Sequence, residues 1–389
     1  MFVLMKDTIF FVINSLGGGG AERVASRLSK EWSERYNLIV ISLQSRTDTD
    51  YQFYGQIIDI SDSFKGLTWY NRIYRCSKRL DDLAEAYKPK TVVSFLQNSN
   101  MCVLWMKYKA KKVVSVRNYL PRLHKGFKLF MWNLLVRKFY KRANYVISVS
   151  ETLNEEMIAN YNLQRSRCKC IYNPYNISDI QTASKEALPN EYKAFFDGNI
   201  VIGTLGNLSI SKGHFHLIRI LNHLRDKINN LRLVIIGADK GTKADLEKLT
   251  REYNLEDRVL FTGLQKNPHR ILSKCDLYVF PSLFEGFPNA LLEAMICELP
   301  VISSDCKTGP REILMPGSGQ QYGLLFEDDT TEWLDSQFSL SQSEIQCVSY
   351  IEDLIANPKK RNKFSQLAQV RALDFNMENI LKQWYEIID

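Results

Sequence analysis

The chain has 389 residues and a formal net charge of +8, and 45% of its residues are hydrophobic and 24% charged. This length suits two domains, and the composition is that of an ordinary folded protein rather than a disordered or collagen-like one. The eight cysteines form no paired C-x-x-C set, and no apolar run reaches the roughly 20 residues needed to cross a bilayer. We therefore expect neither a metal site nor a membrane-spanning helix.

The first 15 residues are apolar but are interrupted by Lys6 and Asp7. They lack the charged start, unbroken apolar run and small-residue cleavage site of a signal peptide. We expect a first buried strand and a cytoplasmic protein.

Short runs rich in Val and Ile alternate with helical patterns along the chain. The runs are Thr8–Asn14, Asn37–Leu43, Thr91–Phe95, Lys112–Val116 and Tyr145–Val149 in the first half, and Ile200–Leu205, Arg232–Ile236, Arg258–Phe261, Leu277–Phe280 and Val301–Ser304 in the second. Continuous apolar runs indicate strands buried on both faces, and their alternation with helices indicates parallel sheets. The pattern predicts two doubly wound α/β domains, with a boundary at the turn sequence Asn173–Asn176 and a ligand site in the cleft between them, at the carboxyl ends of the strands.

A glycine-rich motif follows the first predicted strand and precedes a predicted helix over Glu22–Arg35. It is Ser15-Leu16-Gly17-Gly18-Gly19-Gly20-Ala21-Glu22-Arg23. Glycines let backbone N–H groups approach a phosphate, and a helix N-terminus favours negative charge. The alternative is a loop that only turns tightly. The acidic residue that would bind a dinucleotide ribose is missing, and Gln44 lies near that place.

The segment between Ala86 and Ser150 has fourteen Lys and Arg but no Asp or Glu. Within it, Lys125–Arg142 is predicted as a helix. Its apolar residues are Phe127, Phe130, Leu134 and Leu135, and its cationic residues include Lys128, Arg137, Lys138, Lys141 and Arg142. Such a helix suits an anionic membrane surface, and we expect that partner rather than nucleic acid or an ordinary solvated face.

Two further motifs follow predicted strands of the second half. The first is Gly206-Asn207-Leu208-Ser209-Ile210-Ser211-Lys212-Gly213-His214. A lysine at such a strand-to-helix turn can place its ammonium on a diphosphate, and a solvated surface lysine is the alternative. The second motif covers residues 281–295, with Glu285 in a loop and Glu293 about one turn into a helix that begins near Asn289. Carboxylates accept hydrogen bonds from vicinal hydroxyls, and the N–H groups at the helix start suit phosphate oxygens.

With these motifs the chain resembles the family 4 glycosyltransferases over nearly its whole length. The matching segments are GGGGAER, GNLSISKG, Ile236–Asp239, Phe261–Gly263, EGFPNALLEAM and PVISSD. The resemblance implies the GT-B fold, with Rossmann-like domains over residues 1–175 and 176–370 and a final helix in 371–389 that packs back on the first domain. It also implies retention of the anomeric configuration and a nucleotide-sugar substrate, with no metal and no other cofactor.

The resemblance implies a role for each matching residue. Glu293 would hold the donor ribose, Glu285 would lie beside the donor sugar, and Lys212 would neutralise the diphosphate. Of these, we predict Glu285 and Lys212 to be catalytic residues. Further donor contacts are expected from Gly18, Gly19, Gly263, Leu264, Gly286, Phe287, Pro288 and Asn289.

Two positions depart from the family pattern. Asn207, which we include among the donor-binding residues, stands where relatives usually have an arginine, so Arg311, Lys307 or Arg117 would have to supply that charge. Arg117 stands where many relatives have a histidine. An arginine cannot shuttle protons at neutral pH, so we predict that Arg117 is an electrostatic catalyst, with a structural arginine as the alternative.

The five histidines (His124, His214, His216, His223 and His269) show no metal-ligand spacing, and we expect packing or solvent roles for them. For the reaction, we expect transfer of a hexose or N-acetylhexosamine from a UDP-sugar to a polyprenyl-diphosphate-linked saccharide, by a protein peripheral on the inner face of a bacterial cell membrane. This step would serve O-antigen or capsule synthesis. Two alternatives remain: a nucleotide-sugar epimerase or hydrolase of the same architecture, and a non-catalytic nucleotide-sugar-binding module.

Overall fold

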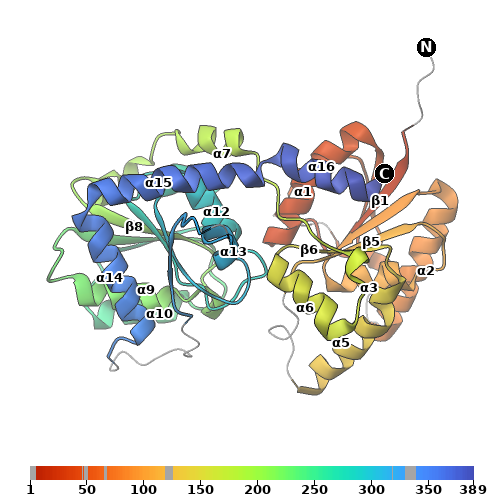
Figure 1. Ribbon diagram of the computed structural model, residues 1–389, viewed down its shortest axis with the longest axis horizontal. Coiled ribbons are helices and arrows are strands. Elements are labelled where there is room, and N and C mark those ends of the chain that lie inside the picture. The colour runs from red at the N-terminus through yellow and green to blue at the C-terminus, as the bar shows by residue number, and fades with distance from the viewer. Residues whose placement is uncertain are drawn as a thin grey trace, which may run out of the picture. The chain divides into compact units, whose positions relative to one another are not determined.

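The computed structural model describes residues 6–45, 47, 51–64, 68–118, 126–317, 319–328 and 339–389. The chain divides into two compact units, the first made of Met1–Pro174 with Met377–Asp389 and the second of Tyr175–Asn376 (Figure 1). The division lies within the turn sequence at Asn173–Asn176. Residues 371–376, which were expected to belong with the final helix, are part of the second unit.

The first unit contains a parallel sheet with the strand order β3-β2-β1-β4-β5-β6-β7. Its strands are β1 (Thr8–Ile13), β2 (Asn37–Ser42), β3 (Gln56–Asp59), β4 (Thr91–Phe95), β5 (Lys111–Val116), β6 (Tyr145–Ser148) and β7 (Cys168–Cys170). All five strands predicted for this half are present. The two that were not predicted, β3 and β7, form the edges of the sheet.

Helices cover both faces of this sheet. They are α1 (Gly20–Arg35), η1 (Ser61–Phe64), α2 (Trp69–Tyr87), α3 (Gln97–Trp105), α5 (Gly126–Phe139), η2 (Tyr140–Arg142), α6 (Glu151–Tyr161), η3 (Arg165–Arg167) and α16 (Met377–Ile388). On one face Phe11 of β1 packs on Trp32 of α1, with ring centroids 4.9 Å apart, and on the other Phe10 packs on Tyr87 of α2 at 6.2 Å. The continuous apolar run of β1 is explained by this burial on both sides.

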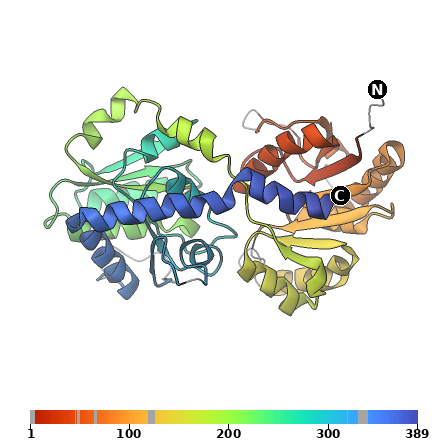
Figure 2. The same ribbon diagram turned by 45° about the horizontal axis from the view of Figure 1, so that its top comes forward.

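The final helix α16 lies beside α1 on the same face of the first sheet (Figure 2). Trp384 is fully buried there, with its ring 5.4 Å from Trp32 and 5.8 Å from Phe95. The C-terminal segment therefore completes the core of the first unit.

The second unit contains a parallel sheet with the order β10-β9-β8-β11-β12-β13. Its strands are β8 (Ile200–Leu205), β9 (Leu231–Ile236), β10 (Val259–Gly263), β11 (Leu277–Phe280), β12 (Val301–Ser304) and β13 (Leu324–Phe326). Its helices are α7 (Ile177–Ser184), α8 (Asn190–Phe196), η4 (Ile210–Lys212), α9 (His214–Leu224), α10 (Lys243–Glu252), α11 (His269–Leu272), α12 (Asn289–Ile296), α13 (Pro310–Leu314), α14 (Gln342–Ala356), α15 (Pro358–Ala372) and η5 (Leu373–Phe375). The stretch Ser178–Asp197, in which the sequence analysis placed no strand, contains most of α7 and all of α8.

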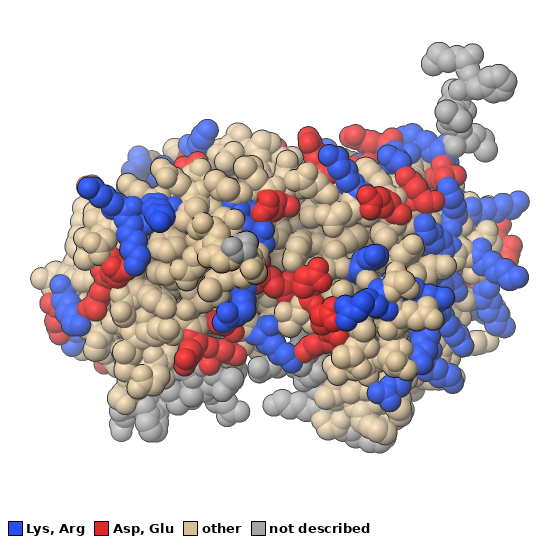
Figure 3. Space-filling view, viewed as in Figure 1, with Lys and Arg blue, Asp and Glu red and all other residues tan. Residues whose placement is uncertain are grey.

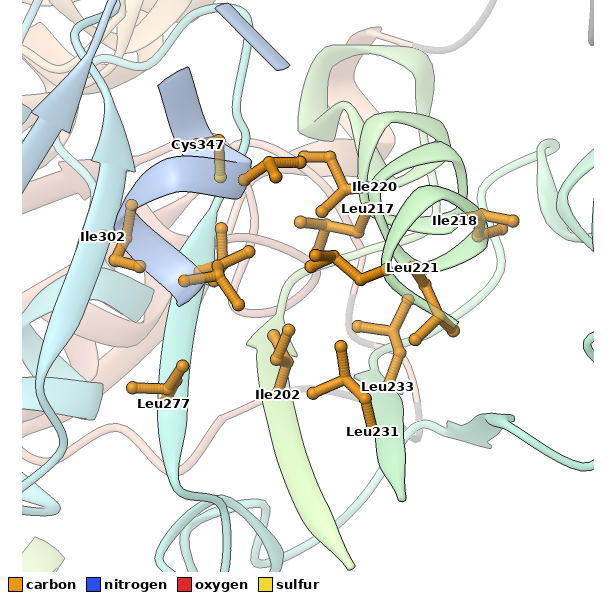
Figure 4. Packing of buried hydrophobic residues seen from close by; sticks show 14 of the residues in the cluster. Ile202, Leu217, Ile218, Ile220, Leu221, Leu231, Leu233, Leu277, Ile302 and Cys347 are labelled. Atoms are coloured by element: carbon orange, nitrogen blue, oxygen red, sulfur yellow. The ribbon is translucent and has the colours of Figure 1, made fainter. Parts of the chain in front are cut away.

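The core of the second unit lies between one face of this sheet and α9, α10 and α14. Ile202, Leu233 and Leu277 point from the strands toward Leu217 and Leu221 of α9 (Figure 4). The alignment of β8, β9 and β11 in this core fixes where their carboxyl ends, and the loops that follow them, are placed.

We predict that Trp384→Ala destabilises the first unit by about 3–5 kcal/mol, because it removes a fully buried indole from the contact between α16 and α1. Gln383→Ala changes an exposed residue of the same helix and should change stability by less than about 0.5 kcal/mol. Urea unfolding followed by circular dichroism measures both variants. Equal stability of the two would show that α16 does not belong to that core.

Candidate functional site

Each sheet reverses its strand order at one point, between β1 and β4 in the first unit and between β8 and β11 in the second. In open parallel sheets, ligands bind beyond the carboxyl ends of the strands at such a point. In the second unit the loops there are residues 206–213 and 281–288, which contain both motifs predicted to bind the donor.

The centre of this edge is an ion pair between Lys212 and Glu285, in which Lys212 Nζ contacts Glu285 Oε1. Both side chains are largely buried but reach solvent. Ser282 Oγ donates to the same carboxylate oxygen at 2.9 Å, and Thr308 Oγ1 donates to the backbone carbonyl of Glu285. Two residues that lie 73 positions apart in the chain are thus brought together, and the Glu285 carboxylate is held from two sides.

The backbones of the two loops are also joined. Leu283 N–H donates to the Ser211 carbonyl at 2.9 Å. Gly213 has a φ of +62°, and a Cβ at this position would lie 2.1 Å from the Pro281 carbonyl oxygen. Only glycine permits both the left-handed backbone and this close approach. The motif sequence Lys212-Gly213 is therefore explained by the packing of one loop on the other.

Glu293 lies in the second turn of α12, and its side chain has 0% exposure. Its Oε2 is 3.3 Å from Nε2 of His269, the first residue of α11. Sequence reasoning had given His269 only a packing or solvent role. The contact could not be seen in the sequence because it joins positions 24 residues apart on two different elements.

The remaining predicted donor contacts of the second unit lie on loops at the same edge. Phe287 is buried against Phe375 with ring centroids 6.0 Å apart, Pro288 is buried, and Asn289 Oδ1 accepts from Tyr175 Oη, so the start of α12 is firmly packed. Gly263 ends β10 with a φ of +67°, and Leu264 after it is 74% exposed. An exposed loop beside a packed helix start suits recognition of a planar base and of phosphates.

Asn207 stands where relatives usually have an arginine, and Arg311 is one of the residues expected to replace its charge. Both residues are exposed. Arg311 forms an ion pair with Asp305.

Next to Lys212, the buried ring of His214 is kept neutral, because burial and then the Lys212 charge lower its pKa to about 3. Lys212 therefore supplies positive charge to this loop without help from that histidine.

Arg117 follows β5 in the first unit and is buried rather than displayed on the surface. Its guanidinium lies 3.6 Å from the centroid of the Phe95 ring, and Arg117 Nη1 donates to Asn173 Oδ1 at 2.6 Å. Stacking and hydrogen bonding hold it in one place, as an electrostatic role would require.

The predicted glycine loop leads into α1, with Gly18 at a φ of +98° and Gly19 at the N-cap. A Cβ on Gly19 would lie 2.5 Å from Glu22 Oε2, so the Glu22 carboxylate folds back over the loop. Burial raises the pKa of Glu22, and hydrogen bonds to its own backbone and to Ser15, together with the Arg117 charge, oppose that rise. A carboxylate thus already lies against the helix start that was expected to meet a phosphate.

The described residues contain no group of three or more His, Cys, Asp and Glu side chains arranged to hold a metal ion. Among the histidines, His216 Nδ1 is 2.9 Å from Glu344 Oε1 in a buried network with Arg219, which is a packing role. His124 lies outside the described residues. A cavity of about 450 Å³ lies at the opposite, amino edge of the first sheet and is lined in part by Lys141 and Arg167.

Comparison with known proteins gives matches over nearly the whole chain. The family model for glycosyl transferases group 1 matches residues 184–371, and that for Glycosyltransferase Family 4 matches residues 18–179. An uncharacterized glycosyltransferase of Methanocaldococcus jannaschii is 29% identical over 83% of this chain and 85% of its own.

The N-acetylgalactosamine-N,N'-diacetylbacillosaminyl-diphospho-undecaprenol 4-alpha-N-acetylgalactosaminyltransferase of Campylobacter jejuni is 28% identical, over 95% of this chain and 96% of its own. The crystal structure of Anabaena HepE in complex with UDP and glucose matches with a TM-score of 0.74 and 20% identity, covering 98% of each chain. The fold, the motif residues gathered at the switch point of the second sheet and both family models agree: the chain belongs to the family 4 glycosyltransferases and has the GT-B fold with two Rossmann-like units.

Proposed function

We propose that this glycosyltransferase moves a hexose or N-acetylhexosamine from a UDP-sugar to a polyprenyl-diphosphate-linked saccharide, with retention of the anomeric configuration, in bacterial O-antigen or capsule synthesis. The observation that carries the proposal is the Lys212–Glu285 ion pair at the switch point of the second sheet, with Glu293 in the helix that follows. The named activity of the Campylobacter relative, transfer to a diphospho-undecaprenol acceptor, supports the acceptor class.

In this proposal each part of the donor has its own partner in the second unit. Glu293 accepts hydrogen bonds from the ribose hydroxyls, Lys212 neutralises the diphosphate, and Glu285 lies beside the sugar. Gly263 and Leu264 contact the base. Backbone groups over Gly286–Asn289 contact the sugar and phosphates, where the start of α12 favours negative charge.

The chemical step exchanges one bond at the anomeric carbon for another. The bond to the diphosphate oxygen breaks, a bond to the acceptor hydroxyl oxygen forms, and the hydroxyl proton leaves with the nucleoside diphosphate. Negative charge grows on the diphosphate as its bond breaks, so the fixed cation of Lys212 stabilises the transition state more than the ground state. We propose that the lysine fills this role without a divalent metal, and we assign Gly18, Gly19 and Arg117 of the first unit to the departing diphosphate and the acceptor.

A direct test combines a thermal-shift screen of UDP-sugars with a transfer assay on polyprenyl-diphosphate saccharides. A bound donor should stabilise the protein by about 2.7 kcal/mol at a hundredfold excess over its Kd. Lys212→Gln should lower kcat about a hundredfold, because it removes a cation from the leaving group. Lys227→Gln, which changes an exposed lysine on a distant surface, should leave kcat unchanged. Removal of divalent metal ions with EDTA should also leave kcat unchanged. Conversion of the UDP-sugar to its epimer without an acceptor would contradict transfer as the function.

For Arg117, we predict that Arg117→Ala lowers kcat/KM about a hundredfold, because it removes a fixed charge that stabilises the transition state. Arg117→Lys keeps the charge but not the flat contact with Phe95, and it should keep part of the activity. Melting temperatures identify any variant that loses activity through unfolding. A stable Arg117→Ala protein with unimpaired kcat/KM would contradict the assigned role.

We also propose that the first unit binds an anionic membrane surface through α5. The inner side of α5 is buried, with Phe139 stacked on Trp105 at 4.6 Å, whereas Phe130, Met131 and Leu134 are exposed. Cationic residues follow at Arg137, Lys138, Lys141 and Arg142, and Figure 3 shows Lys and Arg side chains gathered on the first unit around α2. The side chains of Phe127 and Lys128 are outside the described part of the chain.

This arrangement suits peripheral binding, with aliphatic and aromatic side chains in the interface and cations on the head groups. No helix in the described residues is long and apolar enough to cross a membrane. A polyprenyl-linked acceptor would be reached from such a surface. Binding at the inner face of the cell membrane is part of the same proposal.

Co-sedimentation with vesicles of phosphatidylglycerol and phosphatidylcholine tests the membrane surface. Leu134→Ser should weaken binding, because it removes an aliphatic group that is 47% exposed on α5. Ile345→Ser changes a residue with 48% exposure on α14 and should bind as the wild type does. No binding of the wild type to anionic vesicles, or an equal loss in both variants, would contradict the proposal.

A further inference from the structure

His269, for which the sequence suggested only a packing or solvent role, lies against the most deeply buried acid of the proposed donor site. Glu293 has 0% side-chain exposure and His269 has 12%, and their Oε2 and Nε2 atoms are 3.3 Å apart. Burying a carboxylate is costly unless hydrogen-bond donors compensate it. The imidazole is such a donor, and it brings no permanent charge that would cancel the carboxylate.

The position of His269 is set by contacts that do not involve Glu293. Asn267 Oδ1 accepts from the backbone N–H of His269 at 3.1 Å and of Arg270 at 3.4 Å, and its Nδ2 donates to the Ala183 carbonyl at 2.8 Å. Ser273 Oγ donates to the Ser184 carbonyl at 2.7 Å. Helix α11 is therefore fixed on the end of α7, and this helix sets the position of the imidazole beside Glu293.

The chain that leads to His269 is the segment proposed to contact the base. It runs from Gly263 and Leu264 through a turn in which Gln265 Nε2 donates to the Thr262 carbonyl at 2.8 Å. The ring thus lies between the base-binding loop and the carboxylate that takes the ribose. A carboxylate has about four acceptor positions, so one donated hydrogen bond from a histidine leaves capacity for sugar hydroxyls.

We infer that His269 is a positioning residue for the donor: it orients the Glu293 carboxylate so that this group accepts hydrogen bonds from the ribose hydroxyls. The inference rests on the proposed donor site and adds a residue to it. A hydrogen bond between Nε2 and an ionised Glu293 carboxylate requires Nε2 to carry the hydrogen, so in this arrangement His269 donates. Without this donor, the carboxylate would lose a compensating hydrogen bond and a contact that orients it, and the loss would be felt at the ribose rather than at the base or the phosphates.

Calorimetry with UDP and with 2′,3′-dideoxy-UDP, which lacks both ribose hydroxyls, isolates the ribose contact. Wild-type protein should bind UDP more tightly than the dideoxy compound. His269→Ala should weaken UDP binding about tenfold or more, the usual effect of losing a hydrogen bond to a charged group, and should leave the affinity for the dideoxy compound nearly unchanged. His269→Gln, whose amide can donate in place of the ring, should recover part of the loss. In the transfer assay, KM for the donor should rise while kcat stays within about twofold.

His223→Ala is the matched control, because His223 is an exposed histidine on α9, and it should bind both nucleotides as the wild type does. An unchanged UDP affinity in His269→Ala would overturn the inference. So would an equal loss for both nucleotides, which would indicate a general disturbance of the loop, or tighter binding, which would mean that the ring occupies the place of the ribose. Failure of the wild type to bind UDP would instead contradict the proposed function.

Discussion

The ion pair between Lys212 and Glu285 connects the loops that follow β8 and β11, the two strands at which the second sheet reverses its order. A lysine and a carboxylate in contact, partly shielded from water, hold each other in place before any ligand arrives. The Gly213 backbone under the Pro281 carbonyl and the hydrogen bond from Leu283 to Ser211 set the distance between the same two loops. A diphosphate entering this edge would compete with Glu285 for the lysine, so donor binding and the position of Glu285 are coupled.

A second network of buried polar groups, made of Glu344, His216 and Arg219, stabilises the helix that follows the Lys212 loop. Burial alone would raise the pKa of Glu344, but hydrogen bonds from His216 and Arg219 outweigh it and lower the pKa. Glu344 also completes the capping box of α14 with Ser341, so one carboxylate joins the starts of α9 and α14. Helix α9 begins two residues after Lys212. The network therefore fixes the helix that follows the lysine loop, while the neutral His214 adds no second charge there.

The parts of the fold that were predicted correctly are those in which one local pattern determines the outcome. The central strands, such as β1 and β8, are buried on both faces and appear as unbroken apolar runs. The strands β3, β7 and β13, which were not predicted, lie at the edges of their sheets. The strand β7, for example, is the short segment Cys168-Lys169-Cys170, in which only Cys168 is buried. Helices α7 and α8 were missed because their sequence is largely polar and only a few residues, such as Ile177 and Ile180, are buried.

For the site, sequence reasoning placed Lys212, Glu285 and Glu293 correctly at strand ends and a helix start, because each follows a recognisable run. It could not predict that Lys212 and Glu285 touch, since that depends on β8 and β11 being neighbours. The burial of Arg117 on Phe95, the folding of Glu22 over Gly19 and the contact of His269 with Glu293 likewise depend on tertiary packing. In the second unit, the contacts of Lys212 with Glu285 and of Glu293 with His269 join motif residues and elements that the sequence presents separately.

A crystal structure of the chain with UDP bound would show directly whether the switch point of the second sheet binds the donor. The ribose hydroxyls should lie within hydrogen-bonding distance of Glu293, the diphosphate on Lys212, and the base beside Gly263 and Leu264. A nucleotide bound away from the β8–β11 switch point, or a diphosphate that leaves Lys212 paired only with Glu285, would contradict the proposed donor site.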